Sequence, residues 1–277
     1  MRMFKKVVII GTGVIGGSLG LALKKKHLAG QITGLSRRKE NARLSKKKGA
    51  IDLVSTSLDA VKDADLVILA TPIDAIIDIG LKISKIIKKN CIVIDVGSSK
   101  ENIVSKLSRV IPNFVGCHPL AGSEKKGAAN LEPGIFIGSI CVITPNAKTN
   151  KNTLNKVKSL WKKLGSKIRM LSPKKHDQIL ASTSHLPHAI AFSLLGSIPK
   201  EFLSISSGGL NDTTRIASSD TDLWNQIFLS NRDNLLASLS SFQTELGSLK
   251  SALENKNQKL LTKILTAAKE KRKKLKK

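Results

Sequence analysis

Short apolar runs alternate with helical patterns over the first part of the chain. Each run is rich in Val, Ile or Leu and is bounded by turn residues, as buried strands are. The runs occupy residues 7–10, 31–35, 65–70, 91–96, 113–117 and 139–144. Strands that alternate with helices form parallel sheets with helices on both faces. The pattern therefore predicts a doubly wound α/β domain with parallel strands.

The pattern changes close to residue 172. Long helical stretches follow, without a further convincing strand, over residues 177–193, 220–253 and 258–276. We therefore predict two domains, one over residues 1–172 and an all-helical one over residues 173–277. Ser219 and Asp222 fit a capping box ahead of the second helical stretch. The apolar faces of this half exceed what one copy covers, which favours a dimerisation domain and a homodimer.

A glycine-rich turn joins the first strand to the first helix. Its sequence is G-x-G-x-x-G, placed directly after an apolar strand and before an apolar helix. The glycines permit a tight turn, let the backbone approach a pyrophosphate and let the helix pack on the strand, while the helix N-terminus attracts phosphate. This context predicts a Rossmann dinucleotide-binding unit. The expected cofactor contacts are Gly11, Gly13, Val14, Ile15 and Gly16.

The residues after the second strand bear on the choice of dinucleotide. An NAD-binding unit usually has a carboxylate there, about 20 residues after the glycines, for the ribose 2′-hydroxyl. This chain instead has Ser36, Arg37 and Arg38. A hydroxyl and two guanidiniums suit a 2′-phosphate, which favours NADP over NAD. The alternative is that both arginines are ordinary surface cations.

Polar residues follow three later strands. Thr71 and Pro72 follow the third run, Ser98 and Lys100 the fourth, and His118 the fifth. In doubly wound sheets, ligands bind beyond the carboxyl ends of the strands. We therefore expect a hydroxyl, a lysine and a histidine to meet near the nicotinamide, with Thr71 and Pro72 against the cofactor.

The chain is strongly basic. Its formal net charge is +27, from 47 Lys and Arg against 20 Asp and Glu. The lysines are spread over every segment, and only 3% of the residues are aromatic, so no base-stacking surface is indicated. We interpret the charge as the lysine bias of an ordinary enzyme without a specific nucleic-acid partner. Such a field would still attract anionic substrates and cofactors.

Cysteine usage and the N-terminus bear on the cellular compartment. Cys91, Cys117 and Cys141 have neither C-x-x-C nor zinc spacing, which predicts reduced packing residues and no metal site. Residues 1–6 lead straight into the first strand, which leaves no room for a signal peptide. No apolar stretch reaches the roughly 18 residues of a membrane span. We therefore expect a cytoplasmic protein with no membrane partner.

Four further segments, in order behind the glycine-rich turn, resemble the prephenate/arogenate dehydrogenase family of tyrosine biosynthesis. They read DVGSSK at 95–100, GCHPLAGSE at 116–124, HLPH at 185–188 and DTTRIA at 212–217. Each is short, but the ordered set is highly specific and spans nearly the whole chain. The NADP signature and the absence of fused modules make the chain similar to monofunctional arogenate dehydrogenases. Any tyrosine feedback would then act at the active site.

The resemblance implies an oxidative decarboxylation. Hydride leaves the hydroxyl-bearing ring carbon of prephenate or arogenate for the nicotinamide of NADP, and the ring carboxylate departs as CO₂. His118 is implied as the base, a role that suits a histidine whose pKa lies near working pH. Ser98 is implied to bond the same hydroxyl or to hold the imidazole.

The resemblance also implies the substrate contacts. Arg215 would bind the side-chain carboxylate, with Asp212 aiming it and His188 assisting. His185 and His176 match the family pattern too, as substrate contacts, as residues behind the pocket or as gate residues. Trp224 either walls the pocket or belongs to the core of the helical domain.

Two residues of the GCHPLAGSE segment, Ser123 and Glu124, are expected at the pocket rim. The carboxylate of Glu124 would attract the ammonium group of arogenate and gain nothing from the ketone of prephenate, which favours arogenate. Alternatively, Glu124 pairs with Lys125 or Lys126 in solvent, where an ion pair contributes little.

Two other functions remain open at this point. An NADP-linked β-hydroxyacid dehydrogenase would need a lysine base on the helical domain, where no lysine lies in a recognisable motif. A non-catalytic nucleotide-sensing or nucleic-acid-associated protein would bind polyanions with steep salt dependence.

Overall fold

The computed structural model describes residues 2–37, 39–121 and 127–275. Contacts group the chain into two compact units, Met1–Asn231 and Arg232–Lys277. The first unit contains the sheet and all the side chains that form the site described below. The domain division after residue 172 stays a prediction.

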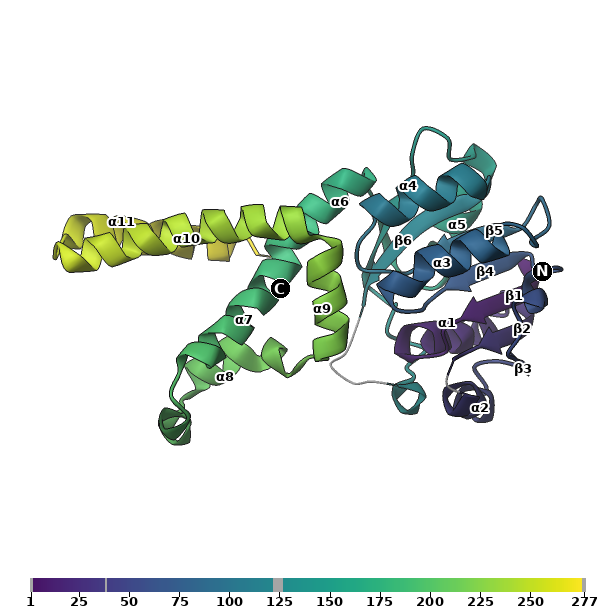
Figure 1. Ribbon diagram of the computed structural model, residues 1–277, viewed down its shortest axis with the longest axis horizontal. Coiled ribbons are helices and arrows are strands. Elements are labelled where there is room, and N and C mark those ends of the chain that lie inside the picture. Colours follow the sequence, from purple (N-terminus) through teal and green to yellow (C-terminus); the bar gives the residue numbers. More distant parts are fainter. Residues whose placement is uncertain (1, 38, 122–126, 276–277) are drawn as a thin grey trace. The chain divides into compact units, whose positions relative to one another are not determined.

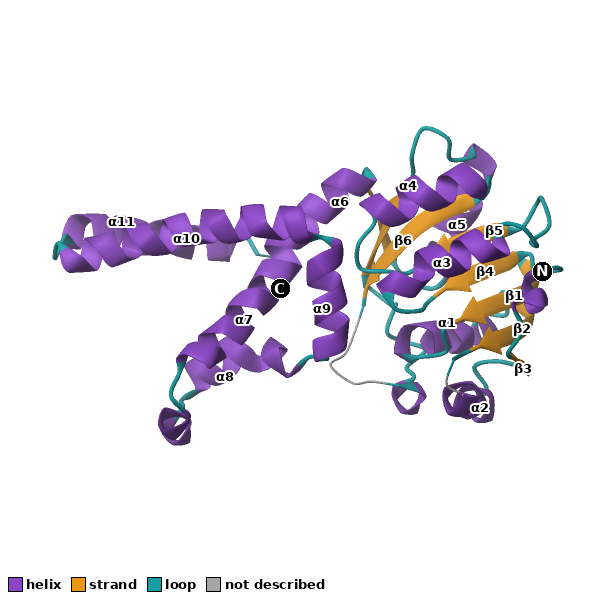
Figure 2. Ribbon diagram, in the orientation of Figure 1, coloured by secondary structure: helices purple, strands orange, loops and turns teal. Residues whose placement is uncertain are grey.

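A sheet of eight strands forms the centre of the first unit within the described residues (Figure 1, Figure 2). Its order is β3-β2-β1-β4-β5-β6-β7-β8. The first six strands are parallel, β7 is antiparallel to β6, and β8 is parallel to β7. The strands are β1 (Phe4–Ile10), β2 (Ala29–Leu35), β3 (Leu53–Ser55), β4 (Leu66–Leu69), β5 (Ile92–Asp95), β6 (Phe114–Leu120), β7 (Ile140–Thr144) and β8 (Lys167–Met170).

Helices connect the strands and make up the chain after β8. Those of the sheet region are α1 (Val14–Lys25), α2 (Lys39–Lys47), α3 (Ile73–Ile83), α4 (Glu101–Val110) and α5 (Lys151–Lys163). Those that follow are α6 (Pro173–Leu180), α7 (Leu186–Ser197), α8 (Gly208–Thr214), α9 (Thr221–Ser230), α10 (Arg232–Glu254) and α11 (Gln258–Lys273). A π-helical turn, Ala181–His185, joins α6 to α7, and a 3₁₀ turn, Arg215–Ser218, follows α8.

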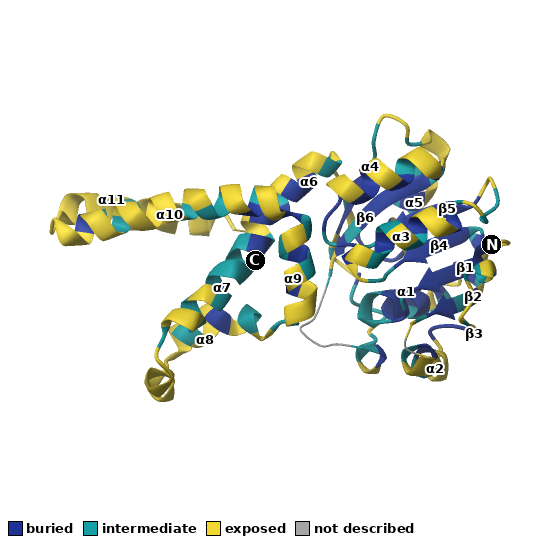
Figure 3. Cartoon of the chain, viewed as in Figure 1, coloured by how far each residue is buried: buried dark blue, intermediate teal, exposed yellow. Residues whose placement is uncertain are grey.

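Alternate side chains of the strands fill two apolar cores, one on each face of the sheet. On one face, residues such as Val7 and Ile9 pack with α1 and α5. On the other face, Val8 and Ile10 pack in a core that includes residues of α3, α4 and α9. Figure 3 shows the strands buried and the outer sides of the helices exposed. Helices therefore cover both faces, as the doubly wound prediction requires.

The predicted fold, an α/β domain followed by a helical region, is confirmed, and all six predicted strands are present. The strands β3 and β8 lack an apolar run and lie largely at the surface, so the sequence pattern does not predict them. The expectation of parallel strands is wrong for β7 and β8. Ile140, the first residue of β7, pairs with Leu120, the last residue of β6. The chain therefore enters β7 at the same end of the sheet at which it leaves β6, and β7 runs in the opposite direction.

This antiparallel pairing changes the setting of His118. The hydrogen-bonded ladder extends β6 through Leu120, whereas the sequence places the strand end at residue 117. His118 therefore lies inside the strand opposite Val142. A strand residue has a more restricted backbone than a loop residue, which suits a side chain that must be held in one place.

The predicted helix boundaries also need correction. The stretch 220–253 is two helices, α9 and α10, because the backbone of Asn231 leaves the helical conformation at φ −124°. The capping box of Ser219 and Asp222 is wrong: Asp220 is the N-cap, and its Oδ1 accepts the N–H of Leu223 at 2.7 Å. Ser219 lies one residue too early for that role, at the end of the preceding 3₁₀ turn.

The second unit is a helical hairpin of α10 and α11. Asn257 caps α11 by accepting the N–H of Leu260 at 2.9 Å. Large apolar side chains on both helices are exposed, among them Leu246, Leu253 and Leu265. Figure 3 shows both helices exposed over most of their length. Within the described ranges, no helix has the length and apolar character needed to cross a bilayer.

Candidate active site

The glycine-rich turn after β1 has the geometry of a phosphate-binding turn. Gly11 has φ +99°, and a Cβ there would lie 2.3 Å from the carbonyl oxygen of Ala70. A Cβ on Gly16 would lie 1.9 Å from the carbonyl oxygen of Gly11. Around Gly13, by contrast, there is nothing within 4 Å of such a Cβ. The first and third glycines thus allow close backbone contacts, and the second leaves the open space that a pyrophosphate needs.

The expected ribose-binding residues follow β2, beside this turn. The N–H of Gly11 donates to the carbonyl of Leu35, the last residue of β2, at 2.8 Å. Ser36 is half-buried and Arg37 is exposed. Arg38 lies outside the described residues.

A cavity of about 780 Å³ extends from the glycine-rich turn across the carboxyl ends of β4, β5 and β6 to the helices after β8. Predicted residues that line it together are Gly13, Val14, Ile15, Thr71, Pro72, Ser98, His118, His185, His188 and Trp224. The buried hydroxyl of Thr71 has no hydrogen-bond partner within the described part of the chain. An unpaired hydroxyl beside an open glycine turn fits a polar cofactor bound there.

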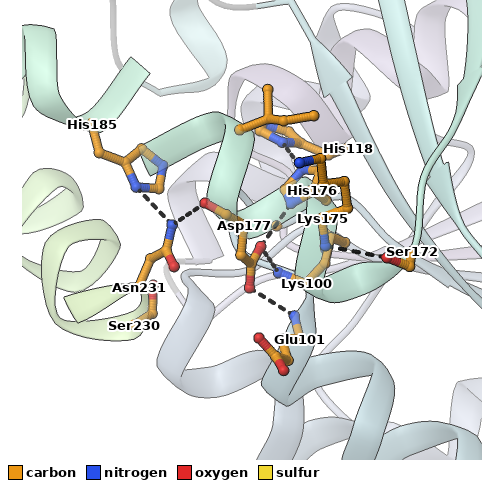
Figure 4. Close-up of polar contacts among 12 residues, drawn as sticks. Lys100, Glu101, His118, Ser172, Lys175, His176, Asp177, His185, Ser230 and Asn231 are labelled. Atoms are coloured by element: carbon orange, nitrogen blue, oxygen red, sulfur yellow. Dashed lines mark hydrogen bonds and ion pairs between the residues drawn. The ribbon is translucent and has the colours of Figure 1, made fainter. Parts of the chain in front are cut away.

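His118 lines this cavity and is hydrogen-bonded to a second histidine behind it (Figure 4). Its Nδ1 lies 2.9 Å from Nε2 of His176 in α6, which is fully buried. Nδ1 of His176 lies 2.7 Å from Oδ1 of Asp177. A carboxylate, two imidazoles and the cavity therefore follow one another in a line.

The carboxylate of Asp177 also caps α4, a helix from a distant part of the sequence. Its Oδ1 accepts the N–H of Lys100 and its Oδ2 accepts the N–H of Glu101, both at 2.8 Å (Figure 4). The backbone oxygen of Asp177 accepts a hydrogen bond from Nδ2 of Asn231 at 2.8 Å. The same amide nitrogen lies 3.2 Å from Nδ1 of His185.

The side chain of Lys100 does not reach the cavity, which contradicts its expected place near the nicotinamide. It is fully buried and forms an ion pair with Asp95, at the end of β5. Asp95 also accepts the N–H of Gly97 at 2.9 Å. Burial raises the pKa of Asp95, whereas Lys100 and the backbone N–H groups lower it. The pair braces the loop on which Ser98 faces the cavity.

His118 is held in its neutral form by its surroundings. Burial lowers its pKa well below the ordinary value, and electrostatic interactions with His176, Lys100 and His185 lower it further. Ser98 lines the cavity from the neighbouring strand end. Within the described residues, the two side chains share the cavity without a direct hydrogen bond.

Three aromatic side chains form the helical wall of the cavity. The ring of His188 stacks on Trp224, with centroids 3.5 Å apart and planes 19° apart. Nδ1 of His188 donates to the carbonyl of Ser184 at 2.9 Å, so this hydrogen bond does not use Nε2. Burial lowers the pKa of His188 and lowers that of His185 to about 4. Trp224 lines the cavity and packs in a core on one face of the sheet, not in a separate core of the helical domain.

The remaining expected substrate residues lie apart from the described lining. Arg215 is exposed at the start of the 3₁₀ turn after α8, although its charge lowers the pKa of His188 and its neighbour Ile216 lines the cavity. Asp212 is exposed in α8. Ser123 and Glu124 lie outside the described residues.

Sequence reasoning missed Asp177, Asn231 and Asp95. The signal for Asp177 is weak, because it is one carboxylate in the first turns of a polar helix. The signal for Asp95 is its place at the end of an apolar strand, five residues before a lysine.

Within the described residues, no group of three His, Cys, Asp or Glu side chains is placed to hold a metal ion.

Comparison with known proteins extends over nearly the whole chain. The family model of the prephenate dehydrogenase nucleotide-binding domain matches residues 19–170, and that of the prephenate dehydrogenase dimerization domain matches residues 172–267. The chain is 33% identical to the prephenate dehydrogenase of Bacillus subtilis, over 97% of this chain and 76% of the relative. It is 32% identical to the cyclohexadienyl dehydrogenase of Zymomonas mobilis, over 93% and 91% of the two chains.

Solved structures agree with these matches. The structure of Aquifex aeolicus prephenate dehydrogenase in complex with hydroxyphenyl propionate and NAD⁺ has a TM-score of 0.93 and 33% identity, and the match covers 98% of both chains. Synechocystis arogenate dehydrogenase has a TM-score of 0.85 and 28% identity, with coverage of 97% and 99%. With both domain models, a 780 Å³ cavity and a neutral histidine at the strand ends, the chain belongs to the prephenate dehydrogenase family and carries out oxidative decarboxylation of prephenate or arogenate.

Proposed function

We propose that this protein uses NADP to oxidise arogenate, with His118 as the base of the reaction. The observation that carries the choice of base is that His118 lines the cavity of the glycine-rich turn while its surroundings hold it neutral. A general base must be unprotonated and within hydrogen-bond reach of the proton that it accepts. The β-hydroxyacid dehydrogenase alternative needs a lysine base, and no lysine is among the described residues that line the cavity.

His118 would both take and return one proton. It accepts the proton of the ring hydroxyl as the C–H electron pair leaves the same carbon and a C=O bond forms. Loss of CO₂ then returns an electron pair to the ring, which becomes aromatic, and the phenolate oxygen recovers the proton from His118. A bound nicotinamide would supply the hydride acceptor. Ser98, on the adjacent strand end, is placed to bond the hydroxyl or to orient the imidazole.

Support for a dinucleotide comes from the open turn at Gly13 and the unpaired hydroxyl of Thr71. Support for NADP is narrower. It rests on Ser36 and Arg37 at the end of β2, where a carboxylate would favour NAD. The Aquifex aeolicus relative was crystallised with NAD⁺, so the choice of cofactor needs a direct test.

Binding of the substrate's side-chain carboxylate is assigned to Arg215 and His188, with Asp212 as a partner of Arg215. A guanidinium binds a carboxylate through two parallel hydrogen bonds, which gives orientation as well as energy. The charge of Arg215 acts on His188, which supports placing both at the same end of the cavity. Ser123 and Glu124 are assigned to the rim near the carbon that carries the ammonium group of arogenate.

The protein is further proposed to be a cytoplasmic homodimer. The match to a dimerization domain and the exposed leucines of α10 and α11 support the pairing of two copies. The buried free cysteines Cys91, Cys117 and Cys141 fit a reducing compartment.

The choice of cofactor predicts the effect of Arg37→Ala. This change should raise the KM for NADP by an amount that corresponds to roughly 1–3 kcal/mol, because charged hydrogen bonds to the 2′-phosphate are lost. The KM for NAD should remain nearly unchanged. Steady-state kinetics with both cofactors measures the effect. Arg43→Ala is the matched control, because it removes an exposed cation from the middle of α2 and leaves the residues that directly follow β2 unchanged. Equal efficiency of the wild type with both cofactors would refute the preference.

The role of His118 predicts that His118→Asn lowers kcat by about 10²–10⁴-fold with little change in KM. His27→Asn is the control, because His27 is exposed at φ +53°, a conformation that Asn tolerates. Near wild-type turnover of His118→Asn would show that another group is the base.

The lowered pKa of His118 predicts the acid limit of activity. A group whose pKa is lowered binds its proton only at lower pH, so the base form persists as the pH falls through 6.5. The acid limb of kcat/KM should therefore lie below the ordinary histidine pKa of about 6.5. The charged and titratable groups that act on His118 are Lys100 at the start of α4, His176 in α6 and His185 in the π-helical turn. An acid limb at or above 6.5 contradicts this setting.

The substrate assignment predicts a higher kcat/KM for arogenate than for prephenate. Glu124→Gln should reduce that preference, because it removes the charge that attracts the ammonium group. Glu201→Gln, in an exposed 3₁₀ turn, is the control. Steady-state kinetics with both substrates decides: a preference for prephenate overturns the assignment, and unchanged selectivity in Glu124→Gln removes Glu124 from it.

The assembly proposal predicts twice the 29.9 kDa chain mass in light scattering at micromolar concentration. Two copies would cover apolar side chains such as Leu246 and Leu265, which favours association. A particle of 29.9 kDa would rule the dimer out.

A further inference from the structure

We propose that His176 and Asp177 are positioning residues that hold His118 in one tautomer, with the proton on Nδ1 and the lone pair of Nε2 available to the cavity. This inference rests on the proposed role of His118 as base. It assigns a function to two side chains that lie behind the cavity and do not line it.

The argument begins at the carboxylate of Asp177. Its two oxygens accept the N–H groups of Lys100 and Glu101, at the N-terminus of α4. Both oxygens thus act as hydrogen-bond acceptors, the role in which a carboxylate caps a helix N-terminus. The 2.7 Å bond between Asp177 and Nδ1 of His176 is therefore donated by His176.

The proton on Nδ1 determines the next bond. When His176 is neutral and carries its proton on Nδ1, its Nε2 has a lone pair and accepts. The 2.9 Å bond between Nε2 of His176 and Nδ1 of His118 is then donated by His118. A neutral His118 with its proton on Nδ1 has an unprotonated Nε2, which is the nitrogen that a general base needs. In the opposite tautomer, Nε2 would carry a proton and could not accept one.

Further contacts hold Asp177 and His176 in the positions that these hydrogen bonds require. Asp177 is bound by α4 through its carboxylate and by Asn231 through its backbone oxygen. His176 is fully buried, so bulk solvent does not compete for its ring nitrogens. Figure 4 shows the carboxylate between the backbone of Lys100 and Glu101 on one side and His176 on the other.

A purely structural role of Asp177, as the cap of α4, makes a different prediction. Loss of a cap lowers thermal stability but has no reason to change which nitrogen of His118 carries the proton. The protonation of His118 in the ligand-free protein therefore separates the two roles. It also separates this inference from the proposed base, because no turnover is needed to measure it.

The test is nitrogen-15 NMR of the imidazole rings in ligand-free protein labelled at its five histidines. Long-range proton–nitrogen couplings report which ring nitrogen is protonated, and the His118→Asn spectrum identifies the His118 signals. The wild type should show His118 protonated on Nδ1. In Asp177→Asn, an amide N–H can donate to His176 and reverse both tautomers, so His118 should move toward protonation on Nε2.

Kinetics of three variants provide the second readout. Asp177→Asn should lower kcat by roughly 10²–10⁴-fold, the range expected when general-base catalysis is lost, with KM little changed. His176→Leu should cause a comparable loss, because it removes the acceptor for His118. His176→Gln should retain kcat within about tenfold of the wild type, because its side-chain oxygen can accept from Nδ1 of His118.

The matched control is Asn150→Ala, which removes the side-chain cap of α5, a helix that does not line the cavity. It should lower the thermal midpoint without changing the His118 signals or kcat. The inference is overturned if wild-type His118 carries its proton on Nε2, or if Asp177→Asn affects kcat no more than Asn150→Ala. If Asp177→Asn fails to fold, equal kcat values for His176→Leu and His176→Gln overturn it instead.

Discussion

The carboxylate of Asp177 is the interaction on which the rest of the site depends. It accepts the first free N–H groups of α4, whose loop carries Ser98, and it accepts a hydrogen bond from His176, which in turn contacts His118. One side chain of α6 thus connects the start of α4 with His176 and, through it, with His118 in β6. Without it, two helix N–H groups and a buried imidazole would lack their partners, which is costly in a low-dielectric interior.

The site combines buried charge with neutral rings. Lys100 and Asp95 form an ion pair beneath the cavity, where each compensates the other and the charge of Lys100 helps to keep His118 unprotonated. Burial lowers the pKa of three histidines around the cavity, His118, His185 and His188. A neutral base beside a strongly positive protein field suits a reaction whose substrate and cofactor are both anionic.

Local patterns predicted the parts of this structure that depend on local chemistry. The glycine-rich turn and the six apolar strands were recognisable because sterics and burial fix the residue types at those positions. His118 was recognisable from its place after an apolar run and from the resemblance of its segment to a known family. The direction of β7 was not, because an apolar run has the same composition in a parallel and an antiparallel strand. Lys100 illustrates a second limit: its position after a strand is correct, but its buried pairing with Asp95 is a tertiary choice. Asp177 acts 76 residues from one of its partners, so no local motif reveals it.

The central claim is that a neutral His118 receives the hydroxyl proton of the substrate, and a crystal structure of the protein with NADP and a phenolic product analogue tests it most directly. The account predicts the phenolic oxygen within about 2.6–3.2 Å of Nε2 of His118, with Nδ1 still bonded to His176. A phenolic oxygen bound to another side chain, with Nε2 of His118 directed away from it, would contradict the account.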